Sequence, residues 1–272
     1  MITNWIENRR NRGVQGSISR YSLLERTVLP RLRERKLKGH TGCVNTCRWN
    51  ETGTTIASGS DDTRILIYKR KSKDHEFECV RRIETDHSAN IFSVDYLSND
   101  DELISGAMDG RVLKHSHGRR SQLYQYRGSC FKVERRKDNE SVVVSSGFGG
   151  VHVHDLRSRC AVSFVTMSGD GEMLWGEPYG MKLNPAMPYL LTVAGGFPFV
   201  LTFDLRRPPP SNRMTSLRDA VHSIRLKPRS ACTCIDISQV CRCIFLCVCV
   251  CNTLFHSFSI APATHPYFTG WT

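Results

Sequence analysis

The sequence has no long apolar run, and its N-terminal residues lack the apolar core of a secretory signal peptide. One uninterrupted apolar run occurs at 243–251, but it is far shorter than the roughly 20 residues that a membrane-spanning helix needs. We therefore expect no membrane partner. Because nothing directs the chain to an oxidising compartment, we expect it in the nucleus or the cytoplasm, where its 12 cysteines would be thiols.

Motifs of catalysis and metal binding are also missing. The sequence has no P-loop, no Gly-x-Ser-x-Gly, no His-Glu-x₂-His and no paired carboxylates that suggest a site. We therefore predict that the protein is not an enzyme and has no catalytic residues and no cofactor. His152 and His154 would share one face of a strand, but packing within a sheet explains this pair better than metal binding does. We predict no metal site.

A helical period is absent after residue 37, and a repeat of small β-meanders takes its place. Residues 39–69 align with 86–116 at an offset of 47, and residues 144–157 ("VSSGFGGVHVHDLR") align with 193–206 ("VAGGFPFVLTFDLR") at an offset of 49. Each unit has β-branched runs separated by turns rich in Gly, Asn and Asp, which predicts an antiparallel sheet of three or four strands. Small sheets repeated at this period pack radially as the blades of a β-propeller.

The first two units carry the same polar residues at aligned positions. The two sets of His, Ser and Asp are His40, Ser58, Asp62 and His87, Ser105, Asp109. Their spacing, with an aromatic residue six positions after the first Asp, resembles the WD-repeat family. The resemblance implies an all-β, incomplete WD-repeat β-propeller at 37–230, with about four blades and one strand of a fifth at 220–228. It also implies that each set forms a buried structural hydrogen-bond network with a Trp, whose position is held here by Tyr68 and His115.

The next two units both end in Asp-Leu-Arg, at 155–157 and 204–206. Identical endings of third strands in neighbouring blades place both guanidinium groups on one rim, where their rigid donor forks suit the carboxylates and carbonyls of a partner. A simpler interpretation is that the Asp holds a turn and the Arg is a solvated charge.

The paired ending resembles the W-D-x-R box of the WD-repeat substrate receptors of cullin-4 RING ubiquitin ligases, including members that also carry tetratricopeptide repeats. In this chain the Trp position of the box is His154 in one unit and Phe203 in the other. The resemblance implies docking on the ligase adaptor, the damage-specific DNA-binding protein. The residues implied in partner binding are Asp155, Arg157, Asp204 and Arg206.

Positive charge is concentrated at the N-terminus. The chain has 38 Lys and Arg against 26 Asp and Glu, a net charge of +12, and residues 1–38 hold ten against three, which is +7. Apolar spacing in 21–40, interrupted at Pro30, predicts a basic, partly helical segment at 1–36. It could pack on the first blade, insert into the adaptor as in some receptors of this type, or serve as a nuclear-import or nucleic-acid patch. Because no aromatic residues alternate with these arginines, we predict no specific nucleic-acid partner.

Residues 231–272 differ in composition from the rest, since seven of the 12 cysteines lie in 232–251. Their Cys-x-Cys spacing, without a second pair at zinc-ribbon distance, argues against a zinc site. A GT dinucleotide tract encodes alternating Val and Cys, as at 247–251. We interpret this segment as an atypical Cys-rich tail from a translated intron and expect that it does not pack on the propeller.

These observations favour a protein-binding WD-repeat scaffold. By resemblance it would be a substrate receptor that docks on the cullin-4 adaptor and presents its other face to an unknown protein client. Two alternatives stay open. One is a chromatin-type or general scaffold without a ligase role, which would use the basic N-terminal segment for acidic partners. The other is a non-functional truncated product, which the tail favours.

Overall fold

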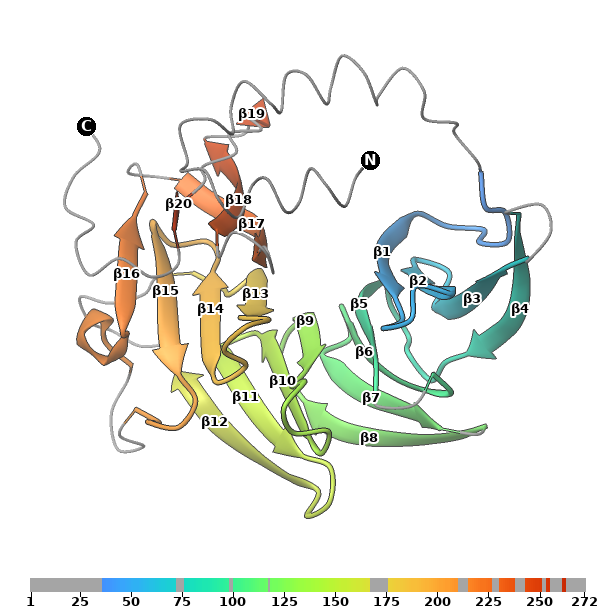
Figure 1. The fold of residues 1–272 in the computed structure, drawn as a ribbon, viewed down its shortest axis with the longest axis horizontal. Coiled ribbons are helices and arrows are strands. Elements are labelled where there is room, and N and C mark those ends of the chain that lie inside the picture. The colour runs from blue at the N-terminus through green and yellow to red at the C-terminus, as the bar shows by residue number, and fades with distance from the viewer. Residues whose placement is uncertain are drawn as a thin grey trace.

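The computed structural model describes residues 36–71, 76–97, 100–116, 118–166, 176–209, 215–226, 230–237, 243–250, 253–254 and 261–262. Apart from residue 36, the predicted basic N-terminal segment at 1–36 lies outside this part of the chain. The described residues form β-sheets and one short 3₁₀ turn (Figure 1). None of their helices is long and apolar enough to cross a membrane.

Four antiparallel sheets of four strands each follow one another along the chain, and in each sheet the strands pair in sequence order. The first blade contains β1 (Val44–Trp49), β2 (Thr55–Ser60), β3 (Arg64–Arg70) and β4 (Phe77–Glu84). The second contains β5 (Ile91–Tyr96), β6 (Glu102–Ala107), β7 (Arg111–Ser116) and β8 (Arg119–Gln125). The third contains β9 (Cys130–Arg135), β10 (Val142–Gly147), β11 (Gly150–Asp155) and β12 (Cys160–Thr166). The fourth contains β13 (Gly180–Leu183), β14 (Leu190–Ala194), β15 (Phe199–Asp204) and β16 (His222–Arg225). The predicted all-β fold with four blades is confirmed.

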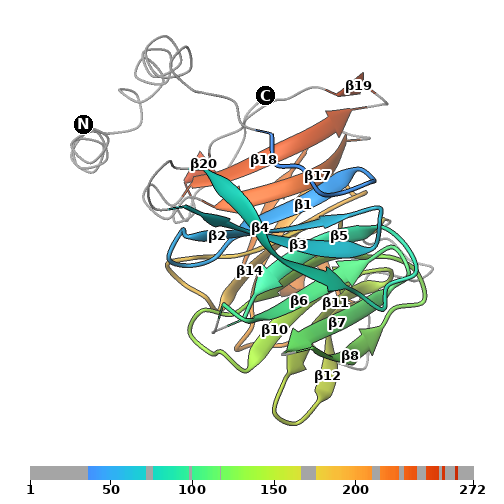
Figure 2. The ribbon, with the colours of Figure 1, turned by 90° about the vertical axis from the view of Figure 1, so that its right-hand side faces the viewer.

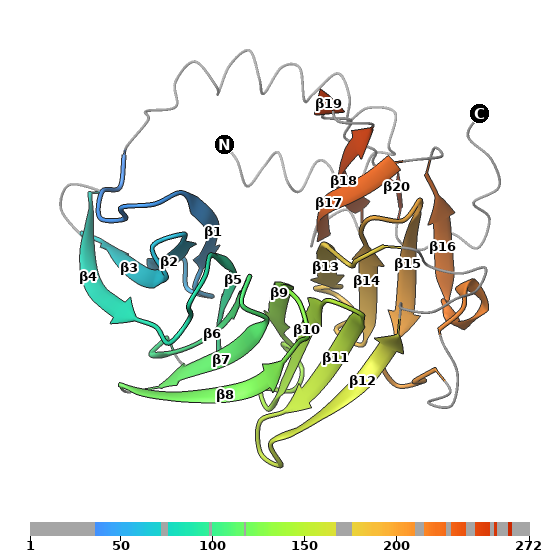
Figure 3. The ribbon, with the colours of Figure 1, turned by 180° about the vertical axis from the view of Figure 1, so that it is seen from behind.

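The blades are arranged around a common centre. The first strands β1, β5, β9 and β13 contact one another in turn, whereas β4, β8, β12 and β16 lie at the periphery (Figures 1 and 3). Figure 2 shows the first blade, in blue to teal, in front of the viewer and above the green second blade. This radial order follows from the repeat, because each small sheet buries both of its faces against its neighbours.

Burial between blades explains why the middle strands are apolar along their whole length. Every residue of β10 and of β14 is buried. One apolar cluster joins the first and second blades, and others join the second to the third and the third to the fourth. Each fully buried Val or Ile in these clusters contributes about 1.5–3 kcal/mol relative to an exposed one.

The segment predicted at 220–228 as the first strand of a fifth blade belongs instead to the fourth. Its strand β16 pairs antiparallel with β15, with Val200 opposite Ile224. The assignment was wrong because an outermost strand has one face in solvent and therefore lacks the continuous apolar run of an inner strand. The loop before β16, which contains the 3₁₀ turn Leu217–Asp219, further separates it from β15 in the sequence.

A fifth sheet follows. It contains β17 (Ser230–Ile237), β18 (Cys243–Val250), β19 (Thr253–Leu254) and β20 (Ala261–Pro262), the last two both paired with β18. Cys232, Ile235 and Ile237 are buried against Ala194 and Val200 of the fourth blade. The expectation that the tail does not pack is therefore wrong for 231–237, because a buried cysteine behaves as a small apolar side chain and completes this face of β17. The translated-intron origin and the boundary at 231 stay predictions.

Candidate functional site

Strand polarity gives the propeller two distinct rims. Because neighbouring strands are antiparallel, the first and third strands of every blade end at the same edge. We call this edge the arginine rim, since Arg157 and Arg206 lie there, each two residues past the end of a third strand, β11 or β15. The opposite edge carries the turns between second and third strands, and we call it the turn rim.

Each box on the arginine rim forms the same compact turn. The backbone N–H of Arg157 donates to Asp155 Oδ1 (2.8 Å), and the backbone N–H of Arg206 donates to Asp204 Oδ1 (2.9 Å). Both guanidinium groups also bond to the carboxylate of their own box. Nη2 lies 3.2 Å from Asp155 Oδ2 in the first box and 2.8 Å from Asp204 Oδ2 in the second. The structure thus brings each predicted Asp together with its Arg.

The two guanidinium groups nevertheless stay accessible. The side chain of Arg157 is 71% exposed and that of Arg206 is 60% exposed. The hydrogen bond from each Arg lowers the pKa of the Asp in the same box, so both carboxylates stay ionised at neutral pH. Arg206 has a further contact, because its Cζ lies 3.6 Å from the ring centroid of Tyr189. The Asp therefore holds the turn and also orients a cation toward solvent.

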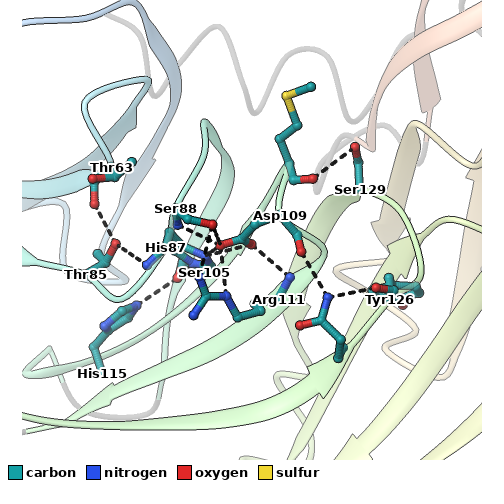
Figure 4. Close-up of polar contacts among 12 residues, drawn as sticks. Thr63, Thr85, His87, Ser88, Ser105, Asp109, Arg111, His115, Tyr126 and Ser129 are labelled. Atoms are coloured by element: carbon teal, nitrogen blue, oxygen red, sulfur yellow. Dashed lines mark hydrogen bonds and ion pairs between the residues drawn. The ribbon is translucent and has the colours of Figure 1, made fainter.

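The second-blade network lies beneath the turn rim and joins a loop to two strands (Figure 4). His87 Nε2 is hydrogen-bonded to Ser105 Oγ at 2.8 Å, and His87 Nδ1 lies 3.1 Å from Asp109 Oδ1. His115 Nε2 completes the chain at 2.7 Å from Ser105 Oγ, in the position that the WD-repeat resemblance gives to Trp. Asp109 also accepts hydrogen bonds from the backbone N–H groups of Ser88 and Arg111, which tie the turn to the loop before β5.

The His, Ser and Asp of the first-blade network have the same geometry. His40 Nε2 lies 2.8 Å from Ser58 Oγ, and His40 Nδ1 lies 3.0 Å from Asp62 Oδ2. Burial alone would raise the pKa of Asp62, but hydrogen bonds from Thr41 N–H, His40 and Arg64 lower this pKa to about 2. The hydroxyl of Tyr68 donates to the carbonyl of Lys38 (3.3 Å).

The third blade contains a network that the sequence analysis missed. Ser145 Oγ lies 2.6 Å from His154 Nε2 and 2.8 Å from the hydroxyl of Tyr126. In the register of β10 and β11, His154 is opposite Val143, two residues before Ser145, just as His115 is opposite Leu103, two residues before Ser105. No His lies at the expected spacing before Ser145. Tyr126 lies 19 residues before Ser145, whereas His lies 18 residues before Ser in the first two blades, and its hydroxyl replaces the imidazole. A search that allowed any hydroxyl or imidazole and a shift of one position would have found it.

The His152 and His154 pair serves packing in this structure. His152 Nε2 is hydrogen-bonded to the hydroxyl of Tyr124 at 2.8 Å, and its ring packs at 4.3 Å between centroids on the same tyrosine. Burial lowers the pKa of both imidazoles to about 4. Among the described residues, no group of three or more His, Cys, Asp or Glu side chains could hold a metal ion.

A second missed feature is a set of ion pairs where the first strands end at the arginine rim. Arg48 Nε lies 2.8 Å from Asp95 Oδ1, and Arg48 Nη2 lies 3.2 Å from Glu134 Oε1. Lys182 Nζ lies 2.8 Å from the same Glu134 oxygen and 3.6 Å from Asp236 Oδ1. These five side chains come from β1, β5, β9, β13 and β17, so all five sheets are connected around a cavity of about 540 Å³.

In these ion pairs, each charged group stabilises the ionised form of its partner. Burial raises the pKa of Asp95 against the opposing effect of Arg48. Burial lowers the pKa of Arg48, but Asp95 and Glu134 outweigh it, and the net shift is upward. The sequence did hold a signal, because the offset of 47 that aligns His40 with His87 also aligns Arg48 with Asp95. Opposite charges at equivalent positions of neighbouring first strands indicate contact between blades.

Comparisons with known proteins agree with this geometry. The family described as "WD domain, G-beta repeat" matches residues 32–69 and 77–113. DDB1- and CUL4-associated factor 6 of Homo sapiens is 39% identical over 217 residues, which are 74% of this chain and 24% of that protein. WD and tetratricopeptide repeats protein 1 of Homo sapiens is 28% identical over 206 residues, which are 72% of this chain and 30% of that protein. The chain therefore spans less than a third of the length of either relative.

A solved structure gives the same fold. It is titled "Crystal Structure of Mitotic Checkpoint Complex", and one of its chains matches 77% of this chain with a TM-score of 0.58. The match covers 58% of that chain at 16% identity, so it bears on the fold alone. With the blades, the two predicted networks and the matched repeats in agreement, the chain belongs to the WD-repeat proteins, and its homologues include DDB1- and CUL4-associated factor 6.

Proposed function

We propose that this WD-repeat scaffold is a substrate receptor that docks through the arginine rim on the DDB1 adaptor of a cullin-4 RING ubiquitin ligase. The observation that carries the proposal is the pair of exposed guanidinium groups of Arg157 and Arg206, each held by the Asp of its own box. The name of one relative, DDB1- and CUL4-associated factor 6, supports the same partner, although that protein is much longer than this chain. The function is non-catalytic, and its setting is the nucleus or the cytoplasm.

The chemistry of the boxes suits recognition more than stability. An exposed ion pair contributes at most about 1 kcal/mol to folding, so two turns of this kind add little to the stability of the propeller. A guanidinium group that is already oriented loses less conformational entropy when a partner's carboxylate or carbonyl binds it. The turn rim faces the other way, and it is the surface left for a protein client.

The test is capture of purified DDB1 by the full chain and four variants. We expect Arg157→Ala and Arg206→Ala each to weaken capture about tenfold, since a hydrogen bond to a charged group contributes about 1.5–3 kcal/mol. The double variant should abolish capture. Arg127→Ala is the matched control, because Arg127 is an exposed arginine in the loop between β8 and β9 at the turn rim.

Thermal melts of all five proteins separate docking from folding. The side chains of both box arginines are largely exposed, so we expect their variants to melt within a few degrees of the wild type. Equal capture by the wild type, the double variant and the Arg127 control would reject the ligase role. The scaffold without a ligase role would then remain.

A further inference from the structure

A groove lies between the second and third blades on the arginine rim, beside the first box. It has a volume of about 480 Å³ and is lined on one side by the end of β7 and by β8, and on the other by the end of β11 and the start of β12. We call it the blade 2–3 groove. Its cationic lining residues are Lys114, Arg119, Arg120 and Arg159, against the single carboxylate of Asp155.

Two of these cations are already neutralised within the protein. Lys114 Nζ lies 3.1 Å from Glu102 Oε2, and Arg120 is paired with Asp86. Asp155 is occupied by its own box, where it holds Arg157. The lining therefore has no carboxylate left for its remaining cations.

Arg119 and Arg159 are those remaining cations. Both are exposed, and neither makes an ion pair with any residue in the described part of the chain. They belong to different blades, one at the start of β8 and the other in the turn before β12, and both line the same groove. Two unpaired guanidinium groups that line one groove raise the affinity of that groove for negatively charged ligands.

The backbone conformation of Arg159 also indicates a binding role. Its φ is +54°, a left-handed conformation that is strained for a residue with a Cβ and that Gly adopts freely. An arginine at such a position is a poor choice for stability alone. Strained residues that persist in this way cluster at binding sites.

We propose that the blade 2–3 groove binds an acidic segment of the docking partner, with Arg119 and Arg159 donating to its carboxylates. This inference rests on the proposed docking of the arginine rim and extends it from the two boxes to the surface beside them. A protein segment fits the groove better than a nucleic acid does. The lining has no Phe, Tyr or Trp side chain on which a base could stack.

The first experiment uses defined probes on the full chain. A fluorescent ten-residue oligo-glutamate peptide and a fluorescent ten-nucleotide oligothymidylate are titrated into the wild type, the Arg119→Ala/Arg159→Ala variant and the Arg127→Ala control. We expect the double variant to bind the peptide about tenfold more weakly and the control to bind it as the wild type does. Equal peptide binding by all three proteins would overturn the inference. It would also be overturned if only oligothymidylate binding depended on the two arginines.

A second variant separates binding from folding. Arg159→Gly removes the guanidinium group and also relieves the left-handed strain, so we expect weaker peptide binding without a lower melting temperature. A variant that melts earlier and binds less would contradict the strain argument, and one that binds as the wild type does would remove Arg159 from the site.

Capture of DDB1 distinguishes this inference from the proposed function. If the box double variant loses capture and the groove double variant keeps it, the groove inference fails while docking stands. If the groove variant loses peptide binding but no variant affects capture, the groove is an acidic-peptide site and the ligase role fails. Loss of capture by both variants, with the Arg127 control intact, is the result we expect.

Discussion

The two rims of the propeller use charge in opposite ways. On the turn rim, the ionisable groups His87 and Asp109 are bonded to each other beneath the surface, while large apolar side chains such as Met108 and Phe148 are exposed at the turns. On the arginine rim, the ion pairs of the first strands connect the blades. Arg157 and Arg206, which follow the third strands, are exposed to solvent there. Since the same strands run from one rim to the other, the difference lies in the residues at their two ends.

The comparison separates charges that hold the fold from charges that are free to bind. Buried and fully paired groups such as Glu134 cost a great deal to unpair, whereas exposed guanidinium groups cost little to remove. Variants of the first kind should therefore change stability, and variants of the second kind should change binding. The following predictions test that division, from the largest effect to the smallest.

Glu134→Ala should have the largest effect on stability. Glu134 Oε1 bonds to Arg48 and Lys182, and Glu134 Oε2 accepts the backbone N–H of Leu183 at 2.8 Å. Removing one partner of a buried pair leaves the other charges uncompensated, so we expect a loss of about 3–5 kcal/mol in the free energy of unfolding. Urea unfolding followed by circular dichroism measures it.

The matched control is Glu78→Ala. Glu78 pairs with Lys71 at 3.0 Å, but both side chains are about half exposed. Such a surface pair contributes at most about 1 kcal/mol. If the two variants unfold at the same urea concentration, the ion pairs around the cavity do not stabilise the packing between blades.

Acidification should destabilise the propeller between pH 6.5 and pH 4. Burial lowers the pKa of His115 and of His154 to about 4, from an ordinary value of 6.5. In this window the unfolded chain binds protons that the folded chain does not, so stability falls as the pH falls, by up to about 3 kcal/mol for each histidine. Nδ1 of both rings has no hydrogen-bond partner among the described residues, so protonation would bury an unpaired N–H.

Urea midpoints measured from pH 7 to pH 4 test this dependence. His154→Gln keeps a group that can bond to Ser145 and removes the titration, so its midpoint should change less with pH than that of the wild type. An identical pH profile for both proteins would rule out His154 as a source of the acid sensitivity.

Asp62→Ala should cost about 1–3 kcal/mol, because it leaves His40 and two backbone N–H groups without their acceptor. The pKa of Asp62 is lowered to about 2, so its contribution is present above its ordinary pKa of 3.8 and is lost as the pH falls through about 2. Asp61→Ala is the control, since the Asp61 side chain makes one hydrogen bond within the described residues, to Asn45 at 2.7 Å. Equal unfolding midpoints for the two variants would contradict a structural role for the network.

The features that were predicted correctly from the sequence are those that its repeats reveal. The offset of 47 located the blades and placed His40, Ser58 and Asp62 together, because equivalent positions of a repeat occupy equivalent places in the fold. The same logic failed where a position changed its residue type, as at Tyr126 in the third blade. It also failed for β16, whose exposed face leaves no periodic signal.

Contacts between blades also limited what could be predicted from the sequence. Arg48 and Glu134 are 86 residues apart, and each alone is indistinguishable in sequence from a solvated surface charge. The groove beside the first box likewise depends on how β8 of one blade lies against β12 of the next. The repeat offset aligns Arg48 with Asp95, but the Arg48–Glu134 pair and the groove become visible only when the radial packing of the sheets is known.

The smallest expected effect distinguishes the two boxes from each other. Arg206 lies over the ring of Tyr189, with 3.6 Å between Cζ and the ring centroid, whereas among the described residues Arg157 has no ring contact of this kind. A cation–π contact at an exposed site contributes about 0.5–1 kcal/mol, so Tyr189→Leu should weaken DDB1 capture about two- to fivefold by freeing the guanidinium group. Tyr189→Phe keeps the ring face and should capture DDB1 as the wild type does. In an Arg206→Ala background, Tyr189→Leu should have no further effect, because the tyrosine acts only through that arginine. A further loss in this background would mean that Tyr189 contacts the adaptor itself, and equal capture by the Leu and Phe variants would mean that the stacking does not orient the box.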